Sequence, residues 1–371
     1  MIEGVIPSTR ALVDSSAVRH NLSHVRLHAP HSRVLAVIKA NAYGHGLVRI
    51  ANALHNADAL AVARVKEGIV LRNAGIKSRI VVLQGFLDRD ELGAHRKFKL
   101  EPVVHNDHQL RLLATCAYLD QLHLWIKLDT GMNRLGFQQS DWNAVLEWLN
   151  KHRNKYAELI WMTHLANADD ISDSTTINQI KLFRSFTETQ SEPVSIANSA
   201  AILGYKQSHS EWVRPGLMLY GVSPFPDRTG SELGLRPAMT LLSRLVSIKQ
   251  LRAGDAVGYG GDWVCKQAMR LGVVAIGYGD GYPRNLKPGT LVVINDVTVP
   301  VVGRVSMDML TVDLSACPDA REGDDVVLWG AQLAVENLAK SSSTIAYTLL
   351  CGMTRRVGIT EVATPQAVAR S

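Results

Sequence analysis

The chain has 371 residues, of which 46% are hydrophobic and 20% are charged. This length predicts two or three domains, and the ordinary composition excludes wholesale disorder, collagen and coiled coil. The formal net charge of +6 comes from scattered basic residues, so we expect no nucleic-acid-binding stripe, and no apolar run is long enough to span a membrane.

Between residues 10 and 235, short apolar runs rich in β-branched residues alternate with helix-like segments. In 141–152, for example, apolar residues stand at 142, 145, 146 and 149, which is a helical period. Ser15 and Ser16 are expected to cap a helix before the first of these strands. Continuous apolar strands separated by helices indicate a parallel sheet buried on both faces. The eight predicted strands are 34–40, 59–63, 80–85, 101–105, 122–129, 158–165, 194–199 and 212–221.

Eight strand–helix units of this total length favour a (β/α)₈ TIM barrel over an open doubly wound sheet. We therefore predict an α/β barrel domain over residues 10–235. Its expected end is a linker rich in Pro and Gly at 223–237.

Residues 236–371 have a different texture and are predicted to form a mainly β domain, with residues 1–9 packed against it. Long β runs are punctuated by Gly, Asn-Asp and Pro, and only two segments near the end are helix-like. The β runs are 238–251, 269–281, 290–314 and 324–330, and the helix-like segments are 334–343 and 343–351.

Polar residues gather where the predicted barrel strands end, which is the rim that carries active sites in barrels of this type. A lysine that ends an apolar strand is costly to bury and is easily shifted in pKa, so it suits a Schiff-base amine. Convergence of several such residues on one rim favours a functional over a purely structural interpretation. The strand-end residues are Lys39, Asn41, Tyr43, His45, Lys127, Asp129, Arg134, His164, Asn198, Ser199 and Arg214.

These residues lie in motifs that resemble alanine racemases, a family of fold-type III pyridoxal-phosphate enzymes. The stretch AVIKANAYGHG (36–46) looks like the cofactor-lysine signature of that family. The resemblance implies a (β/α)₈ barrel followed by a β domain, with active sites built at a homodimer interface. Further matching motifs, in order along almost the whole chain, are KLDTGMNRLG (127–136), MTHLANAD (162–169), IANSAA (196–201), VRPGLMLYG (213–221), VGYGGDW (257–263), IGYGDGYPR (276–284) and VGRVSMDM (302–309).

The resemblance also implies a two-base mechanism of alanine racemisation with pyridoxal 5′-phosphate as cofactor. Lys39 holds the cofactor through a Schiff base and acts as a base on one face of the substrate. Tyr259, from the partner subunit, is the base on the opposite face. His164, hydrogen-bonded towards Arg214, is expected to assist Tyr259, because a tyrosine near its ordinary pKa of about 10 is a poor base at neutral pH.

Other positions are expected to bind the cofactor and the substrate. Arg214 faces the pyridine nitrogen, and Asn198 also binds the cofactor. The phosphate is held by Tyr43, Ser199 and the backbone amides of Gly216 and Leu217. A tyrosine contact that some relatives provide from a Ser-Tyr-Arg-Val sequence has no counterpart in Thr354–Val357. The residues expected at the substrate or at the entrance of its site are Arg134, Met307, Lys127, Tyr278, Asp308 and Arg284.

Two features of these positions stay open at the sequence level. Lys127 is carbamylated in some relatives, and the alternative is an unmodified lysine bound to Asp129. Arg284 fits surface charge as well as an entrance role.

Three alternatives compete with alanine racemisation: a racemase of broader specificity, an amino-acid decarboxylase of the same fold type, and a cofactor-binding module. Such decarboxylases pair the pyridine nitrogen with a carboxylate, which Arg214 argues against. The binding module lacks a β domain, which residues 236–371 argue against. A role in supplying D-alanine for peptidoglycan and a role in alanine catabolism both fit the sequence.

The four cysteines favour a reducing compartment. Cys116, Cys265, Cys317 and Cys351 are far apart and lack C-x-x-C spacing. This spacing excludes a recognisable zinc site or disulfide framework, so we expect no metal. The first residues, MIEGVIPSTR, show no secretory signal, and we expect a cytoplasmic protein.

Overall fold

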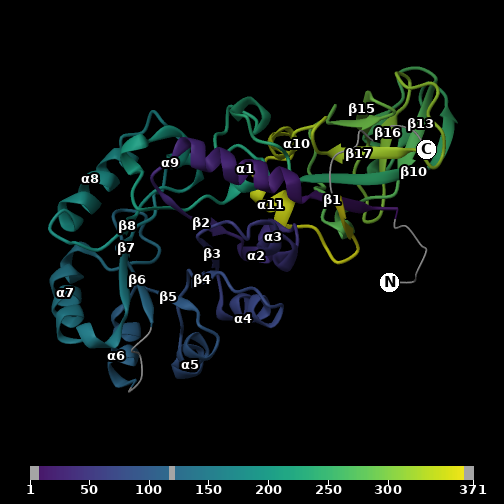
Figure 1. The fold of residues 1–371 in the computed structure, drawn as a ribbon. Helices are drawn as coiled ribbons and strands as arrows, with labels where there is room; N and C mark the ends of the chain where they lie inside the picture. The colour runs from purple at the N-terminus through teal and green to yellow at the C-terminus, as the bar shows by residue number, and fades with distance from the viewer. Residues whose placement is uncertain (1–7, 117–121, 363–371) are drawn as a thin grey trace.

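The computed structural model describes residues 8–116 and 122–362. One part is a closed barrel of parallel strands surrounded by helices, and the other is mainly β (Figure 1). The barrel strands, in order, are β2 (Arg33–Val37), β3 (Ala59–Val62), β4 (Arg79–Val82), β5 (Glu101–Val104), β6 (His123–Lys127), β7 (Glu158–Met162), β8 (Val194–Ser195) and β9 (Trp212–Val213).

The predicted (β/α)₈ barrel is confirmed, and each predicted strand overlaps an observed one, although β2 and β4 begin one residue before their predicted runs. Parallel pairing of β9 with β2 closes the barrel, with Trp212 opposite Arg33. The last strand is much shorter than its predicted run, because Leu217–Tyr220 forms a 3₁₀ turn. The helices are α1 (Ser15–His28), α2 (Lys39–Tyr43), α3 (Leu47–Ala53), α4 (Val65–Asn73), α5 (Arg89–Lys97), α6 (Asp107–Thr115), α7 (Trp142–Lys151), α8 (Thr175–Thr187) and α9 (Ser199–Gly204).

The second part confirms the predicted mainly β domain. Its long strand β10 pairs with β1, β13 and β17, and so links most of the sheet. The sheet order is β13-β16-β15-β14-β17-β10-β1-β18. The elements are β10 (Met239–Leu251), β11 (Ala256–Val257), β12 (Trp263–Val264), β13 (Met269–Val274), β14 (Leu291–Ile294), β15 (Val297–Val302), β16 (Leu310–Asp313), β17 (Asp325–Trp329), α10 (Val335–Ser341), α11 (Ala346–Cys351) and β18 (Gly358–Val362).

The beginning of the chain belongs to this second sheet. Strand β1 (Arg10–Asp14), predicted to open the barrel domain, pairs antiparallel with β10 and parallel with β18. In Figure 1 its purple ribbon lies beside the green and yellow strands. The Thr9 hydroxyl donates to the carbonyl of Ala275 in the same domain. The prediction that residues 1–9 pack here otherwise falls on residues 1–7, which lie outside the described residues.

Helix α1 begins with a different cap from the predicted one. The Asp14 carboxylate accepts hydrogen bonds from the backbone amides of Ser16 at 2.7 Å and Ala17 at 3.2 Å. The prediction of Ser15 and Ser16 as capping residues was therefore wrong by one residue. Asp14 has the extended backbone of an N-cap, and its negative charge suits the positive end of the helix.

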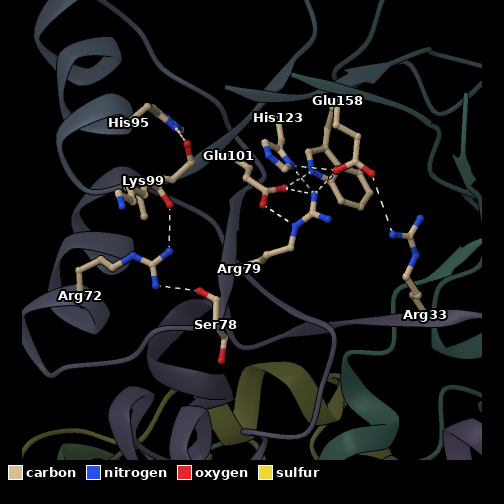
Figure 2. Close-up of polar contacts among 11 residues, drawn as sticks. Arg33, Arg72, Ser78, Arg79, His95, Lys99, Glu101, His123 and Glu158 are labelled. Atoms are coloured by element: carbon tan, nitrogen blue, oxygen red, sulfur yellow. Dashed lines mark hydrogen bonds and ion pairs between the residues drawn. The ribbon is translucent and has the colours of Figure 1, made fainter. Parts of the chain in front are cut away.

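A network of charged side chains lies where the barrel strands begin, at the mouth opposite the strand ends. Its members are the first residues of their strands. Figure 2 shows Arg79 between Glu101, His123 and Glu158. The Arg79 guanidinium lies 2.6 Å from a Glu101 carboxylate oxygen and 2.7 Å from Glu158. Arg33 reaches Glu158 at 4.0 Å and stacks over the ring of Trp212. The network thus joins non-adjacent strands across this mouth.

Breaking this network should destabilise the barrel. Arg79→Met leaves the buried Glu101 carboxylate without its cation, and we expect a loss of about 2–4 kcal/mol in the free energy of unfolding. The matched control Arg111→Met removes an i,i+4 pair whose side chains are 67% and 71% exposed, and should cost less than about 0.5 kcal/mol. Urea denaturation of both variants measures this difference, and equal losses would contradict it.

Candidate active site

A cavity of about 940 Å³ opens at the carboxyl ends of the barrel strands. Side chains from the β domain, including Tyr347 of α11, complete its wall. In the described part of the chain, no helix is long and apolar enough to cross a membrane. The predicted site residues that line the cavity are Lys39, Tyr43, Lys127, Arg134, His164, Asn198, Ser199, Arg214, Gly216 and Leu217.

The remaining predicted site residues lie on the β domain and do not line this cavity. Tyr259 sits between β11 and β12 in a glycine-rich turn and is 71% exposed. Tyr278 and Met307 are also exposed, at 41% and 53%. Asp308 and Arg284 are exposed on the same domain. Within one chain, the predicted residues therefore form two separate groups.

Lys39 begins a turn with an unusual backbone. The next four residues, Ala40, Asn41, Ala42 and Tyr43, all have φ between 52° and 55°, the left-handed region. This region costs residues with a Cβ roughly 1–2 kcal/mol each. Such backbone strain persists only where the surrounding structure imposes it, and it concentrates at functional sites.

Side chains around the turn hold it in place. One Glu67 carboxylate oxygen accepts the amide of Ala40 at 2.8 Å, and the other accepts the amide of Ala63 at 2.8 Å. The fully buried His45 has Nδ1 within 3.0 Å of the carbonyl of Ala42 and 2.9 Å of that of Tyr43. These contacts fix the direction in which Lys39 leaves strand β2.

The cavity concentrates positive charge. Burial, and then Arg134, lower the pKa of the Lys39 amine. Burial, followed by Arg214 and Arg134, lowers the pKa of Lys127 to about 7. One carboxylate oxygen of Asp129 accepts hydrogen bonds from the amides of Gly131 and Asn133 within its own loop. The two lysines are therefore more easily deprotonated than ordinary lysines, and neutral amines are nucleophiles and bases.

Arg214 is buried, and no carboxylate lies within ion-pair distance of it among the described residues. Burial lowers its pKa to about 10, so it remains a cation at neutral pH. Its guanidinium donates to the Ser195 hydroxyl at 2.8 Å and to the carbonyls of Thr163 and Ile196. These neutral acceptors fix the group without neutralising it.

Arg214 also determines the state of His164. Its Nη2 lies 3.4 Å from Nδ1 of that ring. Desolvation in the cavity, and then the Arg214 charge, hold the pKa of His164 well below its usual range, so the ring is neutral. Since a guanidinium can only donate, Nδ1 is the acceptor and the proton sits on Nε2. His164 is therefore a hydrogen-bond donor through Nε2.

A small polar cradle lies beside Tyr43. The Ser199 hydroxyl accepts the amide of Gly216 at 2.8 Å. A Cβ at Gly216 would lie 2.7 Å from the Tyr43 hydroxyl, so glycine leaves room that any side chain would fill. Burial raises the pKa of Tyr43, which keeps its phenol protonated and able to donate. Two hydroxyls thus converge, the Gly216 amide bonds to one of them, and the Lys39 amine opens into the same cavity. These residues fit pyridoxal 5′-phosphate.

Several residues that shape this site were missed by the sequence reasoning. Thr163 and Ser195 hold Arg214, and their place at strand ends could have marked them. Glu67 gives no such indication, because its role depends on the Lys39 turn folding beside α4. The Tyr347 ring lies 5.7 Å from that of Tyr43 and comes from a helix almost at the end of the chain.

Comparison with known proteins gives the family. The model of the alanine racemase N-terminal domain matches residues 13–224, and that of the C-terminal domain matches residues 238–360. The chain belongs to the alanine racemase family. This is a family of isomerases.

Relatives and solved structures agree with this assignment. An alanine racemase of Nitrosomonas eutropha is 45% identical over 94% of this chain and 97% of its own length. The structure of a biosynthetic alanine racemase from Pseudomonas aeruginosa is 39% identical, with a TM-score of 0.92, covering 96% of this chain and 100% of that one. An alanine racemase from Bartonella henselae with covalently bound pyridoxal phosphate is 27% identical, with a TM-score of 0.86, covering 96% of this chain and 100% of that one.

The strain in the lysine turn of this alanine racemase family member can be measured. Ala40→Gly removes the Cβ penalty at φ 54° and should be neutral or stabilising by up to about 1 kcal/mol. Ala144→Gly, at an exposed position in right-handed α7, should instead cost about 0.5–1 kcal/mol. Thermal unfolding compares the two variants, and equal destabilisation would rule out strain in the turn.

Proposed function

We propose that the chain interconverts L- and D-alanine with pyridoxal 5′-phosphate, as a homodimer in which each site takes Tyr259 from the partner subunit. The observation that carries this is the shared cavity of a lysine of lowered pKa and an oxyanion cradle, with a buried arginine between neutral partners. The family assignment and the pyridoxal phosphate bound in the Bartonella henselae protein support it.

Lys39 would hold the cofactor covalently, while Tyr43, Ser199 and the amides of Gly216 and Leu217 would receive its phosphate beside Asn198. When bound, pyridoxal 5′-phosphate supplies an electron-withdrawing ring that acidifies the α-hydrogen of the attached amino acid. The lowered pKa of Lys39 makes its amine easier to deprotonate, which favours the free amine that a proton acceptor needs. Lys39 can therefore move the α-proton on one face of the substrate.

Inversion requires a second proton-transfer group on the opposite face, and we assign this to Tyr259. Its exposure suits a residue that enters another subunit's cavity. The Nε2–H of His164 can donate to the phenol oxygen and so stabilise its ionised form. Arg214 acts through His164 by keeping Nδ1 an acceptor. This chain of contacts would make a tyrosine effective as a base near neutral pH.

Arg134 and the backbone amide of Met307 would bind the substrate carboxylate, with Lys127 positioning Arg134. A neutral Lys127 amine can form a bond to the carbon of CO₂ and lose a proton to solvent, which leaves a carbamate anion. That anion would offset the cations of Arg134 and Arg214, which a protonated Lys127 only repels. We therefore propose that Lys127 is carbamylated.

Carbamylation of Lys127 should depend on pH. Because the amine has a pKa of about 7, protonation at lower pH should remove the reactive form and reduce carbamate occupancy. With ¹³C-bicarbonate at pH 8, the protein should give a carbamate ¹³C resonance that is lost in Lys127→Arg and weakens as the pH falls below 7. A resonance of equal intensity in Lys127→Arg would show that the modified group lies elsewhere.

Arg214 distinguishes this proposal from a decarboxylase of the same fold. The Arg214 guanidinium would keep its protons beside the ring nitrogen, and it has no negative charge with which to hold a proton on that nitrogen. Tyr278, entering with the partner's β domain, and Tyr43 would crowd a long side chain, which favours alanine. The second candidate is a racemase of broader specificity.

The proposed reaction is tested with L-alanine and pyridoxal 5′-phosphate in D₂O. We expect D-alanine, detected with D-amino-acid oxidase, together with loss of the α-proton NMR signal. Lys39→Ala is the inactive control. Release of CO₂, or L-alanine left unchanged and protiated, would contradict the proposal. Comparing kcat/KM for alanine, serine and lysine separates the two candidates, and a preference for lysine would overturn the alanine assignment.

A further inference from the structure

The segment after α11 contains an arginine that joins two loops of the β domain. Nε of Arg356 lies 3.1 Å from Oδ1 of Asp280, and its Nη2 lies 2.7 Å from Oδ1 of Asp308. Asp280 belongs to the turn Tyr278–Asp280, and Asp308 follows Met307 in the next loop. One guanidinium therefore bridges two carboxylates from segments distant in sequence.

The two loops are also joined through their backbones. The amide of Tyr278 donates to the carbonyl of Ser306 at 3.1 Å, and that of Gly279 donates to the carbonyl of Met307 at 2.8 Å. A Cβ at Gly277 would lie 2.2 Å from the Ser306 carbonyl oxygen, so the approach is as close as glycine allows. The position of Met307 is thus tied to that of the Tyr278 turn.

Asp280 makes this turn depend on Arg356. The Asp280 side chain is 6% exposed, and its carboxylate accepts the amide of Gly277 at 3.0 Å. Arg356 is the cation paired with this buried charge. Thr354 adds two bonds, from its amide to the carbonyl of Asp280 and from its hydroxyl to that of Gly279, each at 3.0 Å. The segment 354–356 therefore fixes the turn from outside.

We propose that Arg356 is a positioning residue that holds the Met307 amide and Tyr278 in place for substrate bound in the partner subunit's barrel. This inference rests on the proposed function. Arginine suits the task because its planar fork can engage two carboxylates at once, whereas a lysine ammonium acts as a point charge. The segment Thr354–Val357, which lacks the tyrosine of the relatives' motif, thereby acquires a role on the partner side of the site.

The first test separates substrate binding from turnover. The Met307 amide would contact the carboxylate in both the ground state and the transition state, so loosening it should raise KM with little effect on kcat. We expect Arg356→Gln to raise KM for L-alanine about tenfold with kcat within about threefold. Arg356→Lys should give partial rescue, and Arg321→Gln, an exposed arginine elsewhere on the domain, should match the parent.

A second measurement does not depend on activity. Amide hydrogen exchange at Tyr278 and Gly279 should be faster in Arg356→Gln than in the parent or in Arg321→Gln. Unchanged exchange would overturn the proposal that Arg356 holds the Tyr278 turn, even if the enzyme is an alanine racemase. Faster exchange in a protein that does not racemise alanine would support the hold of Arg356 on the Tyr278 turn and reject the proposed function. A lowered Tm with unchanged KM would overturn the positioning role.

Discussion

Positive charge crowded into one cavity is the constraint on which the rest of the site depends. Lys39, Lys127, Arg134 and Arg214 share the C-terminal mouth of the barrel, and the buried Arg214 is fixed by neutral groups. Desolvation and mutual repulsion favour neutral amines and a neutral His164. The same charge favours anionic ligands, and a phosphate, a carboxylate and a carbamate would each relieve it. Part of the modest excess of basic residues thus serves to bind anionic ligands in this cavity.

The two mouths of the barrel differ in how their charged side chains are used. At the strand starts, the network around Arg79 pairs each buried charge with an opposite one and stabilises the fold. At the strand ends, the positive charge is available to bind anionic ligands. The left-handed turn after Lys39 is strained there, and Glu67 and His45 hold it by hydrogen bonds. This backbone strain therefore lies at the mouth that carries the active site in barrels of this type.

The sequence was sufficient for the architecture and for most of the cavity, because continuous apolar runs that alternate with helices indicate which residues lie near the end of each strand. The sequence was insufficient to place a segment whose partner in the fold is distant along the chain. The run RALVD (10–14) suits either sheet, and only pairing with β10 and β18 assigns it to the β domain. Asp14 outcompetes two serines as a cap because it already ends a strand. The contacts of Glu67, Tyr347 and Arg356 depend on tertiary neighbours that no local pattern reveals.

The residues that line the cavity around Lys39 and the loop that carries Tyr259 are separate in one chain. They are proposed to form one site only when two copies of the chain meet. Co-expression of Lys39→Ala and Tyr259→Phe chains tests this directly, because each mixed dimer would contain one site with both native residues. Each variant alone should be inactive. The mixture should regain about a quarter of the parent racemase activity, since about half of randomly assembled dimers are mixed and one of their two sites is intact. A mixture as inactive as its components would contradict a shared site.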